Sequence, residues 1–111
     1  MLIRLAACGI VAFCATAPGL HAQPAGWPAK PIRMVIPFAA GGPADATARL
    51  LAPRLTEYLG QQMIIDNRGG AGGVIGTEIV AKSPPDGYTV LLMTSSLAIL
   101  PSSRRALPYD T

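Results

Sequence analysis

Three short apolar runs, separated by two segments of helical spacing, constrain the fold of this sequence more than any other feature. The runs are residues 32–38 (IRMVIPF), 62–67 (QMIIDN) and 88–94 (YTVLLMT). Short apolar runs bounded by glycine and proline are typical of buried strands. Strands that alternate with helices predict a parallel sheet with right-handed crossovers. The sequence therefore predicts an α/β fold in the order β-α-β-α-β.

The first helical segment is expected to run from Pro43 to about Leu59. Proline is favourable in the first turn of a helix, and Gly60 is a good C-cap. Apolar residues recur along the segment at helical spacing and define one buried face. Pro53 lies inside the segment, so a kink or a split is expected there.

The second helix is expected at residues 74–82, after a glycine loop at 68–73 (RGGAGG). A turn at 83–87 (SPPDG) follows, because proline presets φ and glycine accepts a positive φ. The residues from Ser95 onward are expected to form a loop that contains Pro101. Three strands with two helices are expected to make half of a doubly wound lobe.

Residues 1–22 are identified as a secretory signal peptide. Arg4 supplies the positive charge, residues 5–17 form an apolar stretch too short to span a bilayer comfortably, and Ala22 precedes the cleavage point. A buried N-terminal helix is the alternative. Cleavage leaves residues 23–111 as the mature chain, and the expected location is the periplasm.

The mature chain is poor in the residues that most nucleophilic and zinc-dependent enzymes use. Cys8, Cys14 and His21 all lie in the signal peptide. Without cysteine or histidine, neither a Cys–His or Ser–His pair nor a zinc site can be built from this segment. We therefore expect no catalytic residues, no metal site and no cofactor. The formal net charge of +3 is small and spread along the chain, which argues against a nucleic-acid partner.

The glycine loop does not match a nucleotide-binding fingerprint. Gly70, Gly73 and Gly76 follow the spacing G-x-x-G-x-x-G, whereas dinucleotide-binding loops have G-x-G-x-x-G. No phosphate-binding G-x-x-x-x-G-K-[ST] sequence is present either. Both observations argue against a nucleotide cofactor.

Three loops are expected to meet at one edge of the sheet, because ligands of open α/β sheets bind beyond the carboxyl ends of the strands. These loops are 39–45, 68–73 and the segment that begins at Thr94. Two of them are glycine turns that lead into helix N-termini, where exposed N–H groups and the helix dipole favour an anion. The edge therefore predicts an anion site, with a carboxylate as a natural ligand.

Each of these features has a simpler structural interpretation. Gly41 and Gly42 can be a tight turn, and the hydroxyls at 94–96 a solvated strand end. Asp45 can be a first-turn acid favoured by the helix dipole, or a carboxylate that contacts the ligand. Arg49, Arg54, Arg104 and Arg105 are expected to be solvated surface residues.

Ordered motifs along the whole mature chain resemble the Bug family of extracytoplasmic solute receptors, which serve tripartite tricarboxylate transporters. The motifs are Trp27-Pro28, Lys30-Pro31-Ile32-Arg33, Val35-Ile36-Pro37-Phe38, Gly41-Gly42, Asp45, Ala48-Arg49, Gly60-Gln61, Asp66-Asn67-Arg68, Gly70-Ala71-Gly72-Gly73, Ile75-Gly76, Val80-Ala81-Lys82, Pro84-Pro85-Asp86-Gly87-Tyr88-Thr89 and Leu107-Pro108-Tyr109-Asp110. Each motif is weak alone, but their order and spacing are specific.

The resemblance implies a two-lobed fold of the type II-like periplasmic binding protein class, with a small carboxylate or related metabolite bound between the lobes. It also implies delivery of that solute to the membrane components of the transporter, and a monomer at full length. Carried onto this sequence, the implied ligand-binding residues are Phe38, Ala39, Ala40, Gly41, Gly42, Asp45, Ala71, Gly72, Gly73, Thr94, Ser95 and Ser96.

Family members continue well beyond the last motif, into a second lobe. Residues 23–111 are therefore expected to be only the β-α-β-α-β part of the first lobe, unable to close on a ligand alone. Two alternatives remain: a secreted α/β enzyme whose catalytic residues lie beyond this segment, and a non-functional remnant of a truncated receptor. The identity of the solute does not follow from the sequence.

Overall fold

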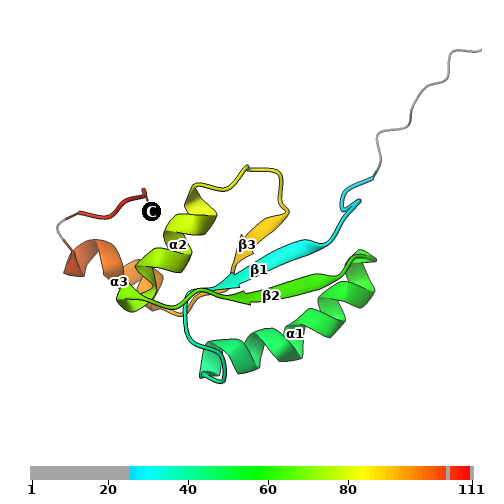
Figure 1. Ribbon diagram of the computed structural model, residues 1–111, viewed down its shortest axis with the longest axis horizontal. Helices are drawn as coiled ribbons and strands as arrows, with labels where there is room; N and C mark the ends of the chain where they lie inside the picture. The colour runs from blue at the N-terminus through cyan, green and yellow to red at the C-terminus, as the bar shows by residue number, and fades with distance from the viewer. Residues whose placement is uncertain (1–25, 105, 111) are drawn as a thin grey trace, which may run out of the picture.

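Residues 26–104 and 106–110 are described by a computed structural model, and the predicted signal peptide lies outside them. The elements follow one another in the predicted order, with one helix added at the end (Figure 1). They are β1 (Ile32–Ile36), α1 (Pro43–Leu59), β2 (Met63–Asn67), a short 3₁₀ turn η1 (Ala71–Gly73), α2 (Val74–Ala81), β3 (Thr89–Leu91) and α3 (Ser96–Ser103).

The three strands form one parallel sheet in the order β2-β1-β3, which confirms the predicted α/β class. β1 is the central strand and pairs with β2 from Ile32↔Met63 to Ile36↔Asn67. It pairs with the shorter β3 from Arg33↔Thr89 to Val35↔Leu91. The carboxyl ends of β1, β2 and β3 therefore lie along one edge.

The core lies between the sheet and α1. Ile32, Met34 and Ile36 alternate along β1 and point to the same face, as the period of two in a strand requires. They pack against the small residues of α1, among them Ala48 and Ala52. Small side chains on this face let the helix approach the sheet closely. α2 lies on the opposite side of the sheet (Figure 1).

α1 is one continuous helix, so the expected split at Pro53 does not occur. Pro53 is exposed, whereas the neighbouring Ala52 is buried against the sheet. Packing of the buried face holds the helix together although proline removes one backbone hydrogen bond. The helix ends as predicted at Gly60, which has a left-handed φ of 70° and donates its N–H to the carbonyl of Thr56 at 3.0 Å.

The residues after Ser95 form helix α3, so the prediction of a loop there is wrong. Pro101 suggested a break, but α3 continues past it to Ser103. The helix buries Leu100, which is 6% exposed. Burial of an apolar side chain is a tertiary effect, and it outweighs the low helix propensity of proline.

An aromatic contact fixes the entry of the chain into β1. The rings of Trp27 and Tyr88 lie 6.1 Å apart, and the Lys30 Nζ lies 4.5 Å from the centre of the Tyr88 ring. Gly87 has a φ of 80°, and a Cβ there would lie 3.1 Å from the Trp27 ring. The positive φ therefore favours glycine at this turn, and a side chain here would also press on the Trp27 ring.

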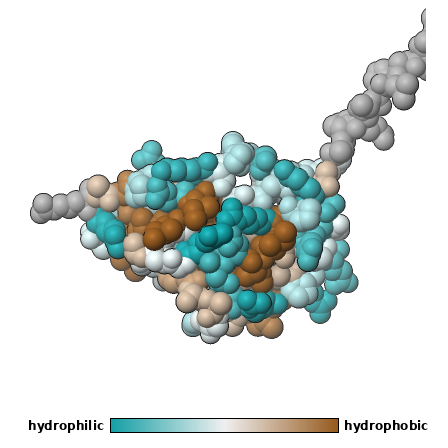
Figure 2. Space-filling view, in the orientation of Figure 1, coloured by the Kyte–Doolittle hydropathy of each residue, from teal (hydrophilic) through white to brown (hydrophobic). Residues whose placement is uncertain are grey.

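Part of the surface is apolar. Figure 2 shows two apolar patches on one face, one over α2 and α3 and one over the sheet, with hydrophilic side chains between them. The exposed large apolar residues include Ile64, Ile75 and Ile99. Within the part of the chain that the structure describes, no helix combines the length and hydropathy needed to cross a bilayer.

Candidate functional site

The loops that follow β1, β2 and β3 meet at the carboxyl edge of the sheet, as parallel pairing requires. Between the first and third loops lies a cavity of about 330 Å³. Phe38, Ala39, Gly42, Pro43, Ala44, Thr94 and Ser96 line it. Five of the predicted site residues are therefore brought together, and the structure adds Pro43 and Ala44. Thr94 and Ser96 hydrogen-bond to each other, with 2.8 Å between their hydroxyl oxygens.

The N-terminus of α1 forms one wall of this cavity. Gly42 is the N-cap, and no side chain caps the helix. Pro43 has no N–H, so Ala44 and Asp45 supply the first helical N–H groups. Uncapped N–H groups at the positive end of a 17-residue helix favour an anion. This wall is therefore suited to a carboxylate.

Asp45 lies behind the first loop and is only 2% exposed. Its Oδ2 accepts hydrogen bonds from the Gly41 N–H and from the Arg49 Nε, both at 2.9 Å. These two contacts, led by that from Arg49, lower the pKa of Asp45 to about 2 against the opposing effect of burial. The geometry favours the first-turn acid interpretation. The Asp45 carboxylate also accepts the hydrogen bond of the Gly41 N–H, and Gly41 is one of the predicted ligand-binding residues.

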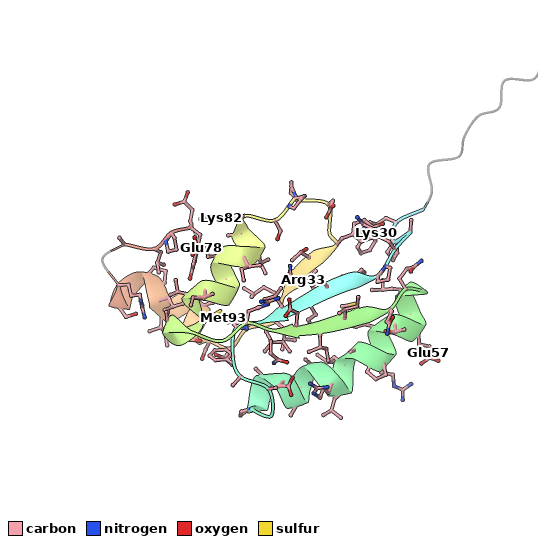
Figure 3. All side chains as sticks on the ribbon, in the orientation of Figure 1. Lys30, Arg33, Glu57, Glu78, Lys82 and Met93 are labelled. Atoms are coloured by element: carbon pink, nitrogen blue, oxygen red, sulfur yellow. The ribbon has the colours of Figure 1, made fainter. Side chains whose placement is uncertain are left out.

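The second glycine loop lies beside the cavity but does not line it. Gly70, Gly72 and Gly73 all have positive φ, and so does Ala71 at 48°. A Cβ at Gly73 would lie 2.8 Å from the Met93 methyl group, so no other residue fits without movement. Met93 lies beside the start of α2 (Figure 3). Residues 71–73, which were predicted to contact the ligand, therefore lie next to the cavity and not in its lining.

Two arginines that were expected to be solvated surface residues form hydrogen bonds at the carboxyl edge of the sheet. Arg49 is paired with Asp45, as described above. Arg104 donates from its NH2 group to the carbonyl of Ala71 at 2.8 Å. Arg104 is exposed, so its remaining donors stay accessible to solvent beside the second loop.

A larger groove of about 600 Å³ lies between α2, β3, α3 and the segment that contains Tyr109. Its walls are mainly apolar, and among the predicted site residues it contains Thr94 and Ser95. Thr94 therefore lies between the two cavities, whereas Ser95 belongs only to the larger one. Ala40 lines neither cavity.

The end of β2 carries polar residues that the sequence analysis did not include among the site residues. Asn67 donates from its side-chain amide to the Phe38 carbonyl at 3.2 Å. Its position at the carboxyl end of a predicted strand was the signal that could have identified it.

Asp66, next to Asn67 on β2, accepts hydrogen bonds from Arg33 at 2.7 Å and from Arg68 at 2.9 Å. Burial raises the pKa of Asp66, but these bonds outweigh it, so the pKa lies below its ordinary value.

Within residues 26–104 and 106–110, the structure holds no cluster of three or more histidine, cysteine, aspartate or glutamate side chains that could bind a metal ion. The carboxyl edge offers hydrogen-bond donors: backbone N–H groups, hydroxyls and guanidinium groups.

The sequence matches a protein-family description over residues 47–111, which is more than half of the chain. That family is the tripartite tricarboxylate transporter family receptor. The chain belongs to this family. BugT of Bordetella pertussis strain Tohama I is 52% identical over 85 residues, which are 75% of this chain and 26% of BugT. The chain spans about a quarter of the length of the curated relatives it matches.

Solved structures of similar proteins support the fold. A periplasmic transporter is 48% identical with a TM-score of 0.72, and the match covers 76% of this chain and 29% of that one. MatC of Rhodopseudomonas palustris, solved with bound malate, is 42% identical with a TM-score of 0.57. An R. palustris protein solved with adipate is 49% identical with the same TM-score. Each of these two matches covers 59% of this chain and 22% of the other.

These findings place the chain in a family of solute-binding receptors, and its α/β fold is consistent with part of one lobe of such a protein. Among the similar proteins of known structure, BugD is a periplasmic binding protein, and two others were solved with the dicarboxylates adipate and malate. The matches cover less than a third of each of these proteins.

Proposed function

We propose that this chain is the N-terminal part of a periplasmic receptor that binds a small dicarboxylate or tricarboxylate and delivers it to a tripartite transporter. The observation that carries the proposal is the cavity of about 330 Å³ at the uncapped N-terminus of α1. It offers N–H groups on one wall and the hydroxyls of Thr94 and Ser96 on another. A carboxylate can accept hydrogen bonds from both walls.

The receptor role is non-catalytic. Closure of two lobes over the ligand would form a state that the transporter recognises. This chain contributes one wall of such a cleft, so its affinity for a carboxylate is expected to be weak. Family membership and the two dicarboxylate-bound neighbours support the choice of ligand class.

An NMR titration tests the proposal. The ¹⁵N-labelled chain, purified from a periplasmic extract, is titrated with malate, adipate and the uncharged analogue adipamide. We expect the amide signals of Gly42 and Ala44 to shift with both carboxylates, with millimolar affinity, because the anion binds at the helix N-terminus. Adipamide is expected to leave them unchanged.

A matched pair of variants locates the binding. Thr94→Val removes a hydroxyl that lines the cavity, and Thr89→Val removes one from β3 outside it. Only the first is expected to weaken carboxylate binding. Equal shifts with adipamide, or no shift at Gly42 and Ala44 with either acid, would contradict the proposal.

A further inference from the structure

The residues at and after the end of β2 lie alongside the residues that follow β1. The pairing between the two strands is therefore followed by contacts between the loops. The N–H of Arg68 donates to the Ile36 carbonyl at 2.7 Å. The side chain of Asn67 donates to the Phe38 carbonyl at 3.2 Å. A Cβ at Gly69 would lie only 3.2 Å from the Ala39 nitrogen. The beginning of the second loop is therefore in contact with the beginning of the first.

Among these contacts, only that of Asn67 depends on a functional group of a side chain. The Arg68 contact uses a backbone N–H, which every residue except proline has. The Gly69 contact depends on the absence of a side chain. Asn67 is half-buried, and its amide offers two donors and one acceptor at the point where both loops leave the sheet.

The first loop is thus held at both ends by side chains. Asn67 holds the carbonyl of Phe38, and the Asp45 carboxylate holds the N–H of Gly41. Between these points lie Ala39 and Ala40. The peptide group is planar and trans, so the N–H of Ala39 points opposite to the Phe38 carbonyl. Fixing that carbonyl fixes the direction of the Ala39 N–H as well.

We infer that Asn67 is a positioning residue of the proposed carboxylate site: its amide holds the Phe38–Ala39 peptide group so that the first loop is preformed before a ligand arrives. Phe38 and Ala39 both line the cavity. A donor group held in place before binding costs less ordering on association, which raises affinity without a new ligand contact. The inference rests on the proposed function, because it assigns Asn67 a role in that site.

The test compares Asn67→Ala and Asn67→Asp with the control Gln62→Ala, which changes an exposed side chain just before β2. Asn67→Asp retains the shape but has no N–H donor, and it places a negative charge beside a carbonyl. We expect the malate affinity to fall about ten-fold in Asn67→Ala, which corresponds to about 1.4 kcal/mol, and further in Asn67→Asp. The thermal midpoint of Asn67→Ala is expected to stay close to that of Gln62→Ala. Unchanged malate affinity in Asn67→Ala, or a loss explained by unfolding alone, overturns the inference.

A second measurement separates this inference from the proposed function. In the ligand-free chain, we expect Asn67→Ala to shift the amide signal of Ala39 and to speed hydrogen exchange at Gly41, while amides in α2 keep their protection. This result supports positioning even if the wild-type chain binds no malate, in which case only the proposed function fails. Unchanged Ala39 and Gly41 amides in a folded Asn67→Ala chain overturn the inference.

Discussion

At the scale of single residues, Asp45 shows how one buried carboxylate can join the loop that follows β1 to helix α1. Its position in the first turn of α1 is favourable for any acid, because the helix dipole is positive there. The fold adds two hydrogen bonds, from Gly41 and Arg49, and nearly complete burial. Asp45 therefore joins the first loop to the helix that follows it.

The lowered pKa of Asp45 predicts a specific acid response. A carboxyl whose pKa falls to about 2 on folding stabilises the folded chain above its unfolded pKa, and this contribution disappears as the pH falls toward 2. Between pH 5 and about pH 2, the wild-type chain is therefore expected to lose more stability than Asp45→Asn. Urea unfolding followed by circular dichroism at several pH values measures the difference.

The variant Glu57→Gln is the control, because it removes an exposed acid from the same helix. Its stability is expected to follow the wild-type curve in this pH range. If Asp45→Asn also follows the wild-type curve, the Asp45 carboxylate contributes nothing to the stability of the loop.

At the scale of elements, α1 contains a proline that its surroundings tolerate. Pro53 cannot donate to the carbonyl of Arg49 four residues earlier, and its ring crowds that turn. The buried face of the helix, which includes Ala48 and Ala52, keeps the turn in place. The helix is therefore held by packing at a position where its own hydrogen bonding is weakened.

Replacement of this proline is expected to stabilise the chain. Proline is about 3 kcal/mol less favourable than alanine inside a helix, and its stiffening of the unfolded chain offsets about 1 kcal/mol of that difference. Pro53→Ala is thus expected to raise the free energy of unfolding by about 2 kcal/mol. Urea unfolding measures it, with the exposed neighbour Arg54→Ala as a control that should change little. A lower stability of Pro53→Ala would show that the proline conformation itself is needed.

The approach of α2 to the sheet depends on Gly76. A Cβ at this position would lie 2.7 Å from the Pro37 Cα and 2.8 Å from the Arg68 carbonyl oxygen. Both neighbours are backbone atoms, so they cannot move aside as a flexible side chain could. Glycine is ordinarily unfavourable inside a helix, and this close contact explains its presence here.

Gly76→Ala is therefore expected to destabilise the chain. Alanine gains about 1 kcal/mol of helix propensity over glycine, but overpacking of this kind costs about 1–3 kcal/mol or more. We expect a net loss in the free energy of unfolding. Gly26→Ala is the control, because a Cβ there meets no atom within 4 Å. A more stable Gly76→Ala chain would show that α2 can move away from the sheet at little cost.

At the scale of the whole molecule, helices α1 and α2 cover different parts of the sheet. α1 packs mainly on β2 and β1, and α2 on β1 and β3. Parallel sheets are ordinarily covered on both faces. Here Ile64 of β2 is 47% exposed, and it contributes to an apolar surface that water contacts.

This open surface predicts self-association of the isolated chain. Exposed apolar patches next to a free strand edge promote association between copies. We expect analytical ultracentrifugation to show a mass that rises with concentration, and we expect Ile64→Lys to reduce the association. Ala46→Lys adds the same charge on an exposed part of α1 and serves as the control. If both variants reduce association equally, net charge rather than the open sheet face governs it.

Features that depend on local pattern could be predicted from the sequence. Apolar runs predicted the three strands, helical spacing and terminal Pro43 and Gly60 predicted α1, and motif order identified the family that the comparisons confirm. Parallel alternation placed the three loops at one edge, which is where the cavity lies. These features follow from the types and spacing of residues along the chain, so they can be predicted without knowledge of tertiary contacts.

Features that join residues distant in the chain became visible in the folded structure. The strand order β2-β1-β3, the contact of Asn67 with Phe38 and the separation of residues 71–73 from the cavity all depend on packing between elements. Helix α3 forms despite Pro101 because burial of Leu100 outweighs local propensity. Burial and close contact in space carry no local signature along the chain, and for this reason the sequence predicted the carboxyl edge but not the arrangement of side chains within it.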